Sequence, residues 1–129
     1  MNPVMIFLDA IRDHLDLHVL PPVSSIDITK WTNPITVQLD ADDLAGVSRA
    51  LLAWANTLDT VTAHIQRMKP GDSVHLSIYG RTPCGVLVKV YGGVPFAEDT
   101  FPDLPVGIKQ DVPLFIMRRW ADSAGEVAA

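Results

Sequence analysis

The chain has 129 residues, about the length of one ordinary globular domain, and 48% of them are hydrophobic, which is enough to build one core. Ten basic residues against fifteen acidic ones give a net charge of −5, which argues against binding nucleic acid through a basic surface. A single cysteine, Cys84, excludes an internal disulfide and a cysteine-based zinc site.

No signal peptide and no apolar stretch long enough to span a membrane can be identified in the sequence. We therefore expect a cytoplasmic protein that makes no membrane contact. One domain is expected over residues 1–129, with a flexible tail at 123–129.

The first third of the chain predicts a helix followed by a β-hairpin. Apolar residues recur at three- and four-residue spacing over residues 3–18, which is the pattern of an amphipathic helix. Two stretches in which apolar and polar residues alternate, 23–31 and 34–39, follow this helix. Thr32 and Asn33 separate them as a turn, so we expect the two strands to pair as a hairpin.

A second helix is expected over residues 41–58. Asp40 can cap its first turn by accepting a backbone N–H. Its apolar stripe consists of Leu44, Val47, Leu51, Trp54 and Leu58. Uncharged residues on its outer side leave room for contact with a second copy of the chain, so a homodimer is expected as one form of self-association. These outer residues are Ala45, Leu52 and Ala53.

The stretch 60–67 is open to two interpretations. The apolar stripe of the second helix continues formally to Met68, so one long helix is the alternative. The same stretch alternates strictly between apolar and polar residues, and because Thr and Val favour strands over helices we predict a strand. With 73–80 and 85–92 it would form a three-stranded meander, and its apolar side would pack against the second helix.

A loop rich in proline and glycine, 93–110, follows the meander. Residues 111–120 then predict a short closing helix, with Asp111 as its cap and Pro113 in its first turn, and a last strand is the alternative. The expected order is α-β-β-α-β-β-β-α. This order describes a single α+β domain in which a central helix packs on an antiparallel sheet.

Two glycines five residues apart, Gly80 and Gly85, match the spacing of a phosphate-binding P-loop. That loop requires Lys and then Ser or Thr directly after the second glycine, followed by a helix. Hydrophobic residues and a predicted strand follow instead. We interpret these residues as a hairpin turn shaped by Pro83 and Gly85, and expect no nucleotide cofactor.

Cys84 lies in this predicted turn. A nucleophilic role would pair it with His75 or His64. A hairpin tip offers neither a base nor a helix N-terminus to lower the pKa of a thiol, so an unreactive turn cysteine is favoured.

His14 and His18 are four residues apart at the end of the first predicted helix, a spacing that can place two imidazoles on one metal ion. The zinc-protease pattern also requires Glu directly after the first histidine, and Leu15 stands there instead. We interpret both as histidines near a helix C-terminus and expect no metal site.

The polar side of the predicted meander carries the strongest candidate site. Strand alternation places His64, then His75 and Tyr79, then Lys89 and Tyr91 on one side of the sheet. These groups could serve acid–base chemistry or anion binding, and tyrosine-rich surfaces are also good protein contact sites. A merely solvated sheet surface is the alternative to any functional interpretation.

Three stretches, 51–67, 71–81 and 88–96, resemble small proteins of actinobacterial phages and prophages that have no established reaction. They read LLAWANTLDTVTAHIQR, GDSVHLSIYGR and VKVYGGVPF. The resemblance implies an accessory protein made in the host cytoplasm that engages a host component. It implies no cofactor and no catalytic residue.

Three functional interpretations follow, in order of preference. The first is a non-enzymatic phage-encoded accessory protein that binds a host macromolecule or itself. The second is a small enzyme that uses the open sheet surface, with His64, His75, Tyr79 and Lys89 as its candidate groups. The third is a weak nucleic-acid binder, which the acidic total disfavours. Its candidate contacts are Arg67, Arg81, Lys89, Arg118 and Arg119.

Overall fold

The computed structural model describes residues 2–31 and 34–128, with side chains described as far as Ser123. The elements in chain order are α1 (Pro3–Leu17), β1 (Val23–Ile28), β2 (Ile35–Leu39), α2 (Leu44–Ala55), β3 (Asp59–Met68), β4 (Ser73–Arg81), β5 (Leu87–Pro95), β6 (Lys109–Val112) and α3 (Leu114–Ala128). The predicted α+β class and element order are confirmed, with β6 as an additional strand. None of the helices in the described part of the chain is long and apolar enough to cross a membrane.

Six strands of the described chain form one sheet in the order β1-β2-β5-β4-β3-β6. Neighbouring strands run antiparallel except for β2 and β5, which run parallel. The predicted meander is confirmed as β3, β4 and β5. The β1–β2 hairpin is confirmed as a strand pair, while its predicted turn at Thr32 and Asn33 lies outside the described residues.

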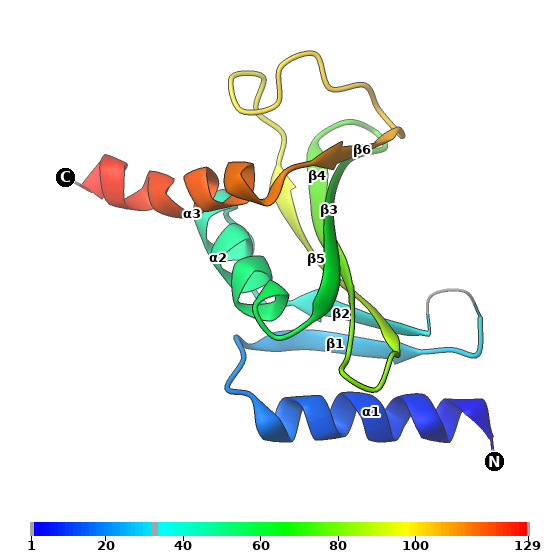
Figure 1. The fold of residues 1–129 in the computed structure, drawn as a ribbon. Helices are drawn as coiled ribbons and strands as arrows, with labels where there is room; N and C mark the ends of the chain where they lie inside the picture. Colours follow the sequence, from blue (N-terminus) through cyan, green and yellow to red (C-terminus); the bar gives the residue numbers. More distant parts are fainter. Residues whose placement is uncertain (1, 32–33, 129) are drawn as a thin grey trace.

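The core lies between the apolar side of the sheet and the helices, with α2 and α3 packed together on one side of the sheet and α1 running beside β1 (Figure 1). Three residues of the predicted stripe of α2, Val47, Leu51 and Trp54, are fully buried. The sheet contributes Val37, Val74, Leu76, Ile78, Val88 and Val90, which are fully buried as well. The predicted packing of the meander against the second helix is therefore confirmed.

The bounds of α2 differ from the prediction at both ends. The helix begins at Leu44 because the side chain of Asp43, and not that of Asp40, accepts a hydrogen bond from the backbone N–H of Gly46 at 2.6 Å. It ends at Ala55, and the next element is β3. The strand interpretation of 60–67 is therefore confirmed, and the long-helix alternative is wrong.

The chain between β5 and α3 contains a strand that the sequence analysis assigned partly to a loop and partly to the closing helix. Residues 109–112 form β6, which pairs with the outer edge of β3. Asp111 therefore lies opposite His64 in a ladder and does not cap a helix, as had been predicted. The closing helix is confirmed but begins at Leu114, directly after Pro113. The flexible tail stays a prediction, since α3 continues to Ala128 and residue 129 lies outside the description.

The β4–β5 connection is the predicted hairpin turn. The backbone N–H of Gly85 donates to the carbonyl of Thr82 at 2.8 Å, and the N–H of Thr82 donates to the carbonyl of Val86 at 2.9 Å. Gly85 has φ +92°, a conformation that glycine adopts at little cost. A strand follows this turn, so the arrangement of a P-loop is absent here.

Candidate functional site

The side of the sheet away from α2 carries the polar residues of alternating strand positions. Cross-strand pairing aligns them in rows, of which the first runs Asp27, Thr36, Lys89, Tyr79 and Thr62. The second runs Ser25, Gln38, Tyr91, Ser77, His64 and Asp111, and the third runs Gly93, His75, Gln66 and Lys109. All five predicted site residues are thus brought to one side. We call this surface the open sheet surface.

Tyr91 lies between two of the other predicted residues. Its ring stacks on that of His75, with centroids 5.0 Å apart and an interplanar angle of 29°. The Lys89 Nζ lies over the Tyr91 ring, 5.4 Å from its centroid. Lys89 precedes Tyr91 by two residues on β5, and His75 pairs with Gly93, two residues beyond it. The ring of Tyr91 is therefore bordered on both sides along the strand.

His75 lies against a position without a side chain. A β-carbon on Gly93 would stand 3.6 Å from His75 Cδ2, which is an ordinary contact distance. Burial lowers the pKa of His75 from its ordinary value of 6.5, and the nearby charge of Lys89 lowers it further. His75 is therefore neutral at pH 7 and stacks as an uncharged ring.

Tyr79 is the centre of a second group of contacts. Its hydroxyl accepts a hydrogen bond from Lys109 Nζ at 3.4 Å, and that ammonium group lies 4.8 Å from the ring centroid. The Lys89 ammonium is 5.8 Å from the same centroid, and the His64 ring meets Tyr79 edge-on at 5.1 Å. Lys109 was missed by sequence reasoning because its strand has a single apolar residue and follows a loop-like stretch.

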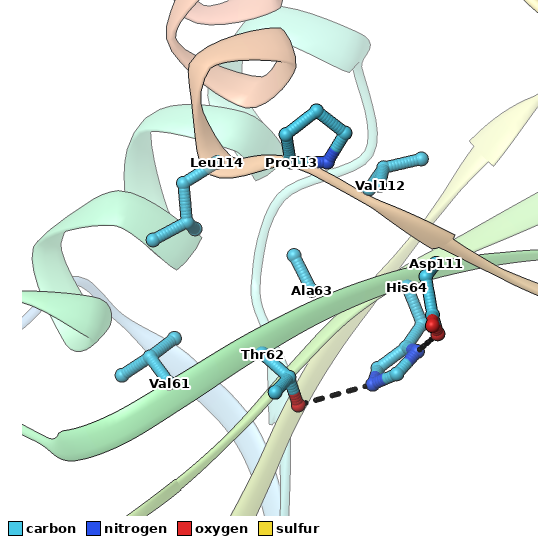
Figure 2. A pocket seen from close by; sticks show the side chains of 8 residues that line it. All are labelled: Val61, Thr62, Ala63, His64, Asp111, Val112, Pro113 and Leu114. Carbon is cyan, nitrogen blue, oxygen red and sulfur yellow. Dashed lines mark hydrogen bonds and ion pairs between the residues drawn. The ribbon is translucent and has the colours of Figure 1, made fainter.

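Thr62, His64 and Asp111 form a chain of contacts beside the start of α3 (Figure 2). Thr62 Oγ1 lies 3.1 Å from His64 Nε2, and His64 Nδ1 lies 2.7 Å from Asp111 Oδ1. The carboxylate is displaced from the direction of the Nδ1–H bond, so the buried Nδ1 has a close ionic neighbour but no well-directed hydrogen bond. The Asp111 side chain is 91% exposed, which weakens its hold on the imidazole.

A hollow of about 360 Å³ adjoins this chain of contacts (Figure 2). Its apolar wall consists of Val61, Ala63, Val112, Pro113 and Leu114. This hollow is not lined by the other four predicted residues, which are His75, Tyr79, Lys89 and Tyr91. The same four residues are absent from the linings of the hollows beside α1 and between α2 and α3. The four groups share the polar side of the sheet, and a surface rich in tyrosine suits a contact with a macromolecule.

Cys84 is exposed in the β4–β5 turn, where its Sγ lies 3.1 Å from Thr82 Oγ1. The turn approaches α1, and Cys84 borders the same hollow as His14. His64 and His75 are not among the residues of that hollow. The pairing with either histidine that a nucleophilic cysteine would need is not formed.

His14 has a structural place that the sequence analysis missed. It is only 4% exposed, and its ring stacks on that of Trp54 with centroids 5.8 Å apart. The hydroxyl of Thr57 donates to the Trp54 carbonyl at 2.7 Å, so Thr57 Oγ1 accepts from His14 Nε2 at 2.8 Å. Burial, and then the neighbouring His18, lower the pKa of His14, which makes it a neutral core residue and not a charged partner of the helix dipole.

A sequence signal for this burial exists. His14 follows Ile11 by three residues and Phe7 by seven, a spacing that places all three on the same side of α1. Its ring lies 4.6 Å from that of His18. Across the described residues, no three His, Cys, Asp or Glu side chains are grouped as a metal site would require.

The arginines proposed for nucleic-acid contact do not share a surface. Arg67 donates to the carbonyls of Gly71 and Leu104 at 2.8 and 3.0 Å, and its guanidinium lies 3.5 Å from the Phe96 ring centroid. Arg81 donates to the Gly85 carbonyl at 2.9 Å. Arg118 and Arg119 belong to α3, which lies on the side of the sheet away from Lys89.

The outer side of α2, predicted as a self-association surface, is partly covered by α3 of the same chain. Ala45 is buried, and Leu52 and Ala53 line a hollow that also includes Arg118 and Ala121 of α3. A homodimer formed through this surface would have to displace α3, or it would have to use only the part of α2 that α3 leaves uncovered. The packing of α3 therefore removes much of the area on which that expectation was based.

Comparison with protein-family models, curated proteins and solved structures finds no match for this chain.

Proposed function

We propose that the chain is a non-enzymatic binding protein that contacts a macromolecular partner through the open sheet surface. If the chain is phage-encoded, as its resemblance implies, that partner is a component of the host cell. The proposal is carried by one observation: His75, Tyr79, Lys89 and Tyr91 gather on a sheet surface that no described helix covers.

The chemistry of these groups supports a contact surface. Tyrosine is enriched in protein interfaces because its ring supplies large contact area and its hydroxyl a hydrogen bond. The stacking of Tyr91 on His75 holds both rings in place before a partner arrives. Less side-chain entropy is then lost on binding.

Affinity capture from host lysate tests the proposal. The unaltered chain is compared with a His75→Ala/Tyr79→Ala/Tyr91→Ala variant, and we expect the variant to lose the captured partner while keeping a cooperative unfolding transition. A Trp31→Ala/Phe115→Ala variant is the matched control, because it removes exposed aromatic rings elsewhere on the chain. Capture by the triple variant at the level of the unaltered chain would contradict the proposal.

A small enzyme acting on the same side of the sheet is the second candidate, favoured by the contact between Thr62 Oγ1 and His64 Nε2. In such an enzyme the imidazole would accept the hydroxyl proton while the oxygen attacks an acyl group. Hydrolysis of p-nitrophenyl acetate tests this candidate. A rate that is equal in the unaltered chain and in His64→Ala would exclude it.

Self-association is the remaining form of the first interpretation. Sedimentation equilibrium of the purified chain tests it, and a monomer at all protein concentrations would leave a host partner as the object of binding.

A further inference from the structure

We propose that the segment bound by the open sheet surface is an extended acidic polypeptide stretch with carboxylates on alternate residues. The inference rests on the proposed function and names the chemistry of the partner. Three properties of the open sheet surface support it: its charges, the contacts of its aromatic rings and the spacing of its two ammonium groups.

The charges of this surface run against those of the whole chain. Lys89 and Lys109 bring two ammonium groups to it, although the chain carries a net charge of −5. Within the described residues neither ammonium forms an ion pair with a carboxylate. Asp111 faces His64, and Asp27 stands at the far end of its row on β1. The middle of the surface is therefore a positive area on an acidic protein, which complements a negatively charged partner.

The aromatic rings are already engaged with one another and with the lysines. Tyr91 has His75 on one side and Lys89 on the other, and Tyr79 is bordered by Lys89, Lys109 and His64. Proteins that bind single-stranded nucleic acid on a sheet stack bases on free ring faces. A base would have to displace these neighbours to stack here, whereas an acidic chain needs only the ammonium groups and the tyrosine hydroxyls as donors.

A nucleic-acid strand is also disfavoured by charge. It carries a phosphate at every nucleotide, and its binding depends on neutralising many of them with basic side chains. The open sheet surface offers two unpaired lysines, while Arg67 and Arg81 are used in hydrogen bonds to backbone carbonyls. A short acidic segment, with few charges, matches this number of cations.

The two ammonium groups converge on one residue. They start from β5 and β6, which are separated by β4 and β3, yet both lie within 6 Å of the Tyr79 ring centroid, at 5.8 and 4.8 Å. In an extended segment, side chains two residues apart point to the same side about 7 Å from each other. Carboxylates on alternate residues can therefore reach both ammonium groups together, next to Tyr79.

Amide chemical-shift titration of the full chain tests the inference with three probes: an eight-residue peptide in which Glu alternates with Ser, the same peptide with Gln in place of Glu, and an eight-nucleotide oligothymidine. We expect the Glu peptide to shift amide signals of β3, β4, β5 and β6, with an affinity that falls as salt is added. In Lys89→Ala/Lys109→Ala the affinity should fall at least tenfold.

The matched control is Lys30→Ala/Lys69→Ala, which removes the same charge from positions outside the open sheet surface. This variant should bind the Glu peptide as the unaltered chain does. Equal weakening in both double variants would show that net charge alone governs binding and would overturn the inference.

Tighter binding of the oligothymidine than of the Glu peptide, shifts confined to another surface, or no shift with the Glu peptide would overturn the inference too. Equal binding of the Gln peptide on the same strands would overturn the acidic preference and leave the proposed function standing. If the triple variant lost lysate capture and the unaltered chain did not bind the Glu peptide, the acidic preference would likewise be overturned and the proposed function would stand. If the triple variant captured the partner as well as the unaltered chain does, the proposed function itself would be contradicted.

Discussion

Gly92 of β5 lies directly beneath Val47 of α2, so closely that a β-carbon on the glycine would stand 2.9 Å from Val47 Cγ1. We expect Gly92→Ala to lower the free energy of unfolding by about 1–3 kcal/mol, because a methyl group there forces the helix away from the sheet. Urea denaturation measures the change.

The neighbouring residue supplies the control. A β-carbon on Gly93 points to the open sheet surface and would stand 3.6 Å from His75, an ordinary contact distance. Gly93→Ala should therefore change stability by less than about 0.5 kcal/mol, as other surface substitutions do. Equal losses for the two alanines would mean that α2 does not lie as close to β5 as described.

Acid should destabilise the fold through two histidines. The pKa values of His14 and His75 are both lowered from 6.5 in the folded chain, mainly by burial. As pH falls through about 6.5 the unfolded chain takes up protons that the folded chain still refuses, so stability is full above that pH and is lost below it. Urea midpoints at pH 7.5, 6.5 and 5.5 measure the loss.

Replacing the two histidines should flatten this dependence. His75→Gln alone should reduce the loss of stability between pH 7.5 and 5.5, and adding His14→Gln should reduce it further. An unchanged slope in His75→Gln would mean that His75 titrates alike in the folded and unfolded chains.

Gly85 is expected to matter through its backbone alone. Apart from Gly85 and its two chain neighbours, no residue has an atom within 4 Å of the position that a β-carbon would take, yet φ is +92°. Gly85→Ala should therefore cost about 1–2 kcal/mol by disfavouring the backbone conformation of the turn, without a clash against other elements of the fold. Gly85→Asn should cost less, because asparagine tolerates positive φ better. Thermal unfolding of both variants checks the order.

Cys84 should be replaceable. Its thiol is exposed, and a serine hydroxyl in its place can keep the contact with Thr82 Oγ1. We expect Cys84→Ser to leave both the urea midpoint and the lysate capture unchanged. Loss of capture in this variant alone would show that the thiol takes part in binding.

Much of the fold was accessible from local patterns because the meander is a local structure. The alternation over 60–67 predicted both β3 and the side on which His64 lies, and the turn chemistry around Gly85 fixed how β4 and β5 meet. The capping residue of α2 was misplaced because Asp40 and Asp43 are both good caps, and only the three-dimensional course of the chain decides between them.

Two features had no local signal. The parallel pairing of β2 with β5 joins stretches far apart in sequence, and periodicity does not report which distant strands meet. β6 is a short edge strand with mostly exposed side chains, so it lacks the apolar alternation by which strands are recognised. Lys109 and Asp111 belong to this strand and lie beside the predicted residues of β3. The sequence could therefore predict the part of the candidate site on β3, β4 and β5, but not the part on β6.

The parallel ladder between β2 and β5 also bears on the order in which the protein folds. The β1–β2 hairpin and the β3–β4–β5 meander each join segments close in sequence, whereas the ladder pairs Ile35 with Val88 and closes a long loop of chain. Because long loops cost more entropy to close, we expect the meander to form before the hairpin docks on it. His64, His75, Tyr79, Lys89 and Tyr91 all belong to the meander. The groups of the open sheet surface would then be assembled early, before the sheet that carries them is complete.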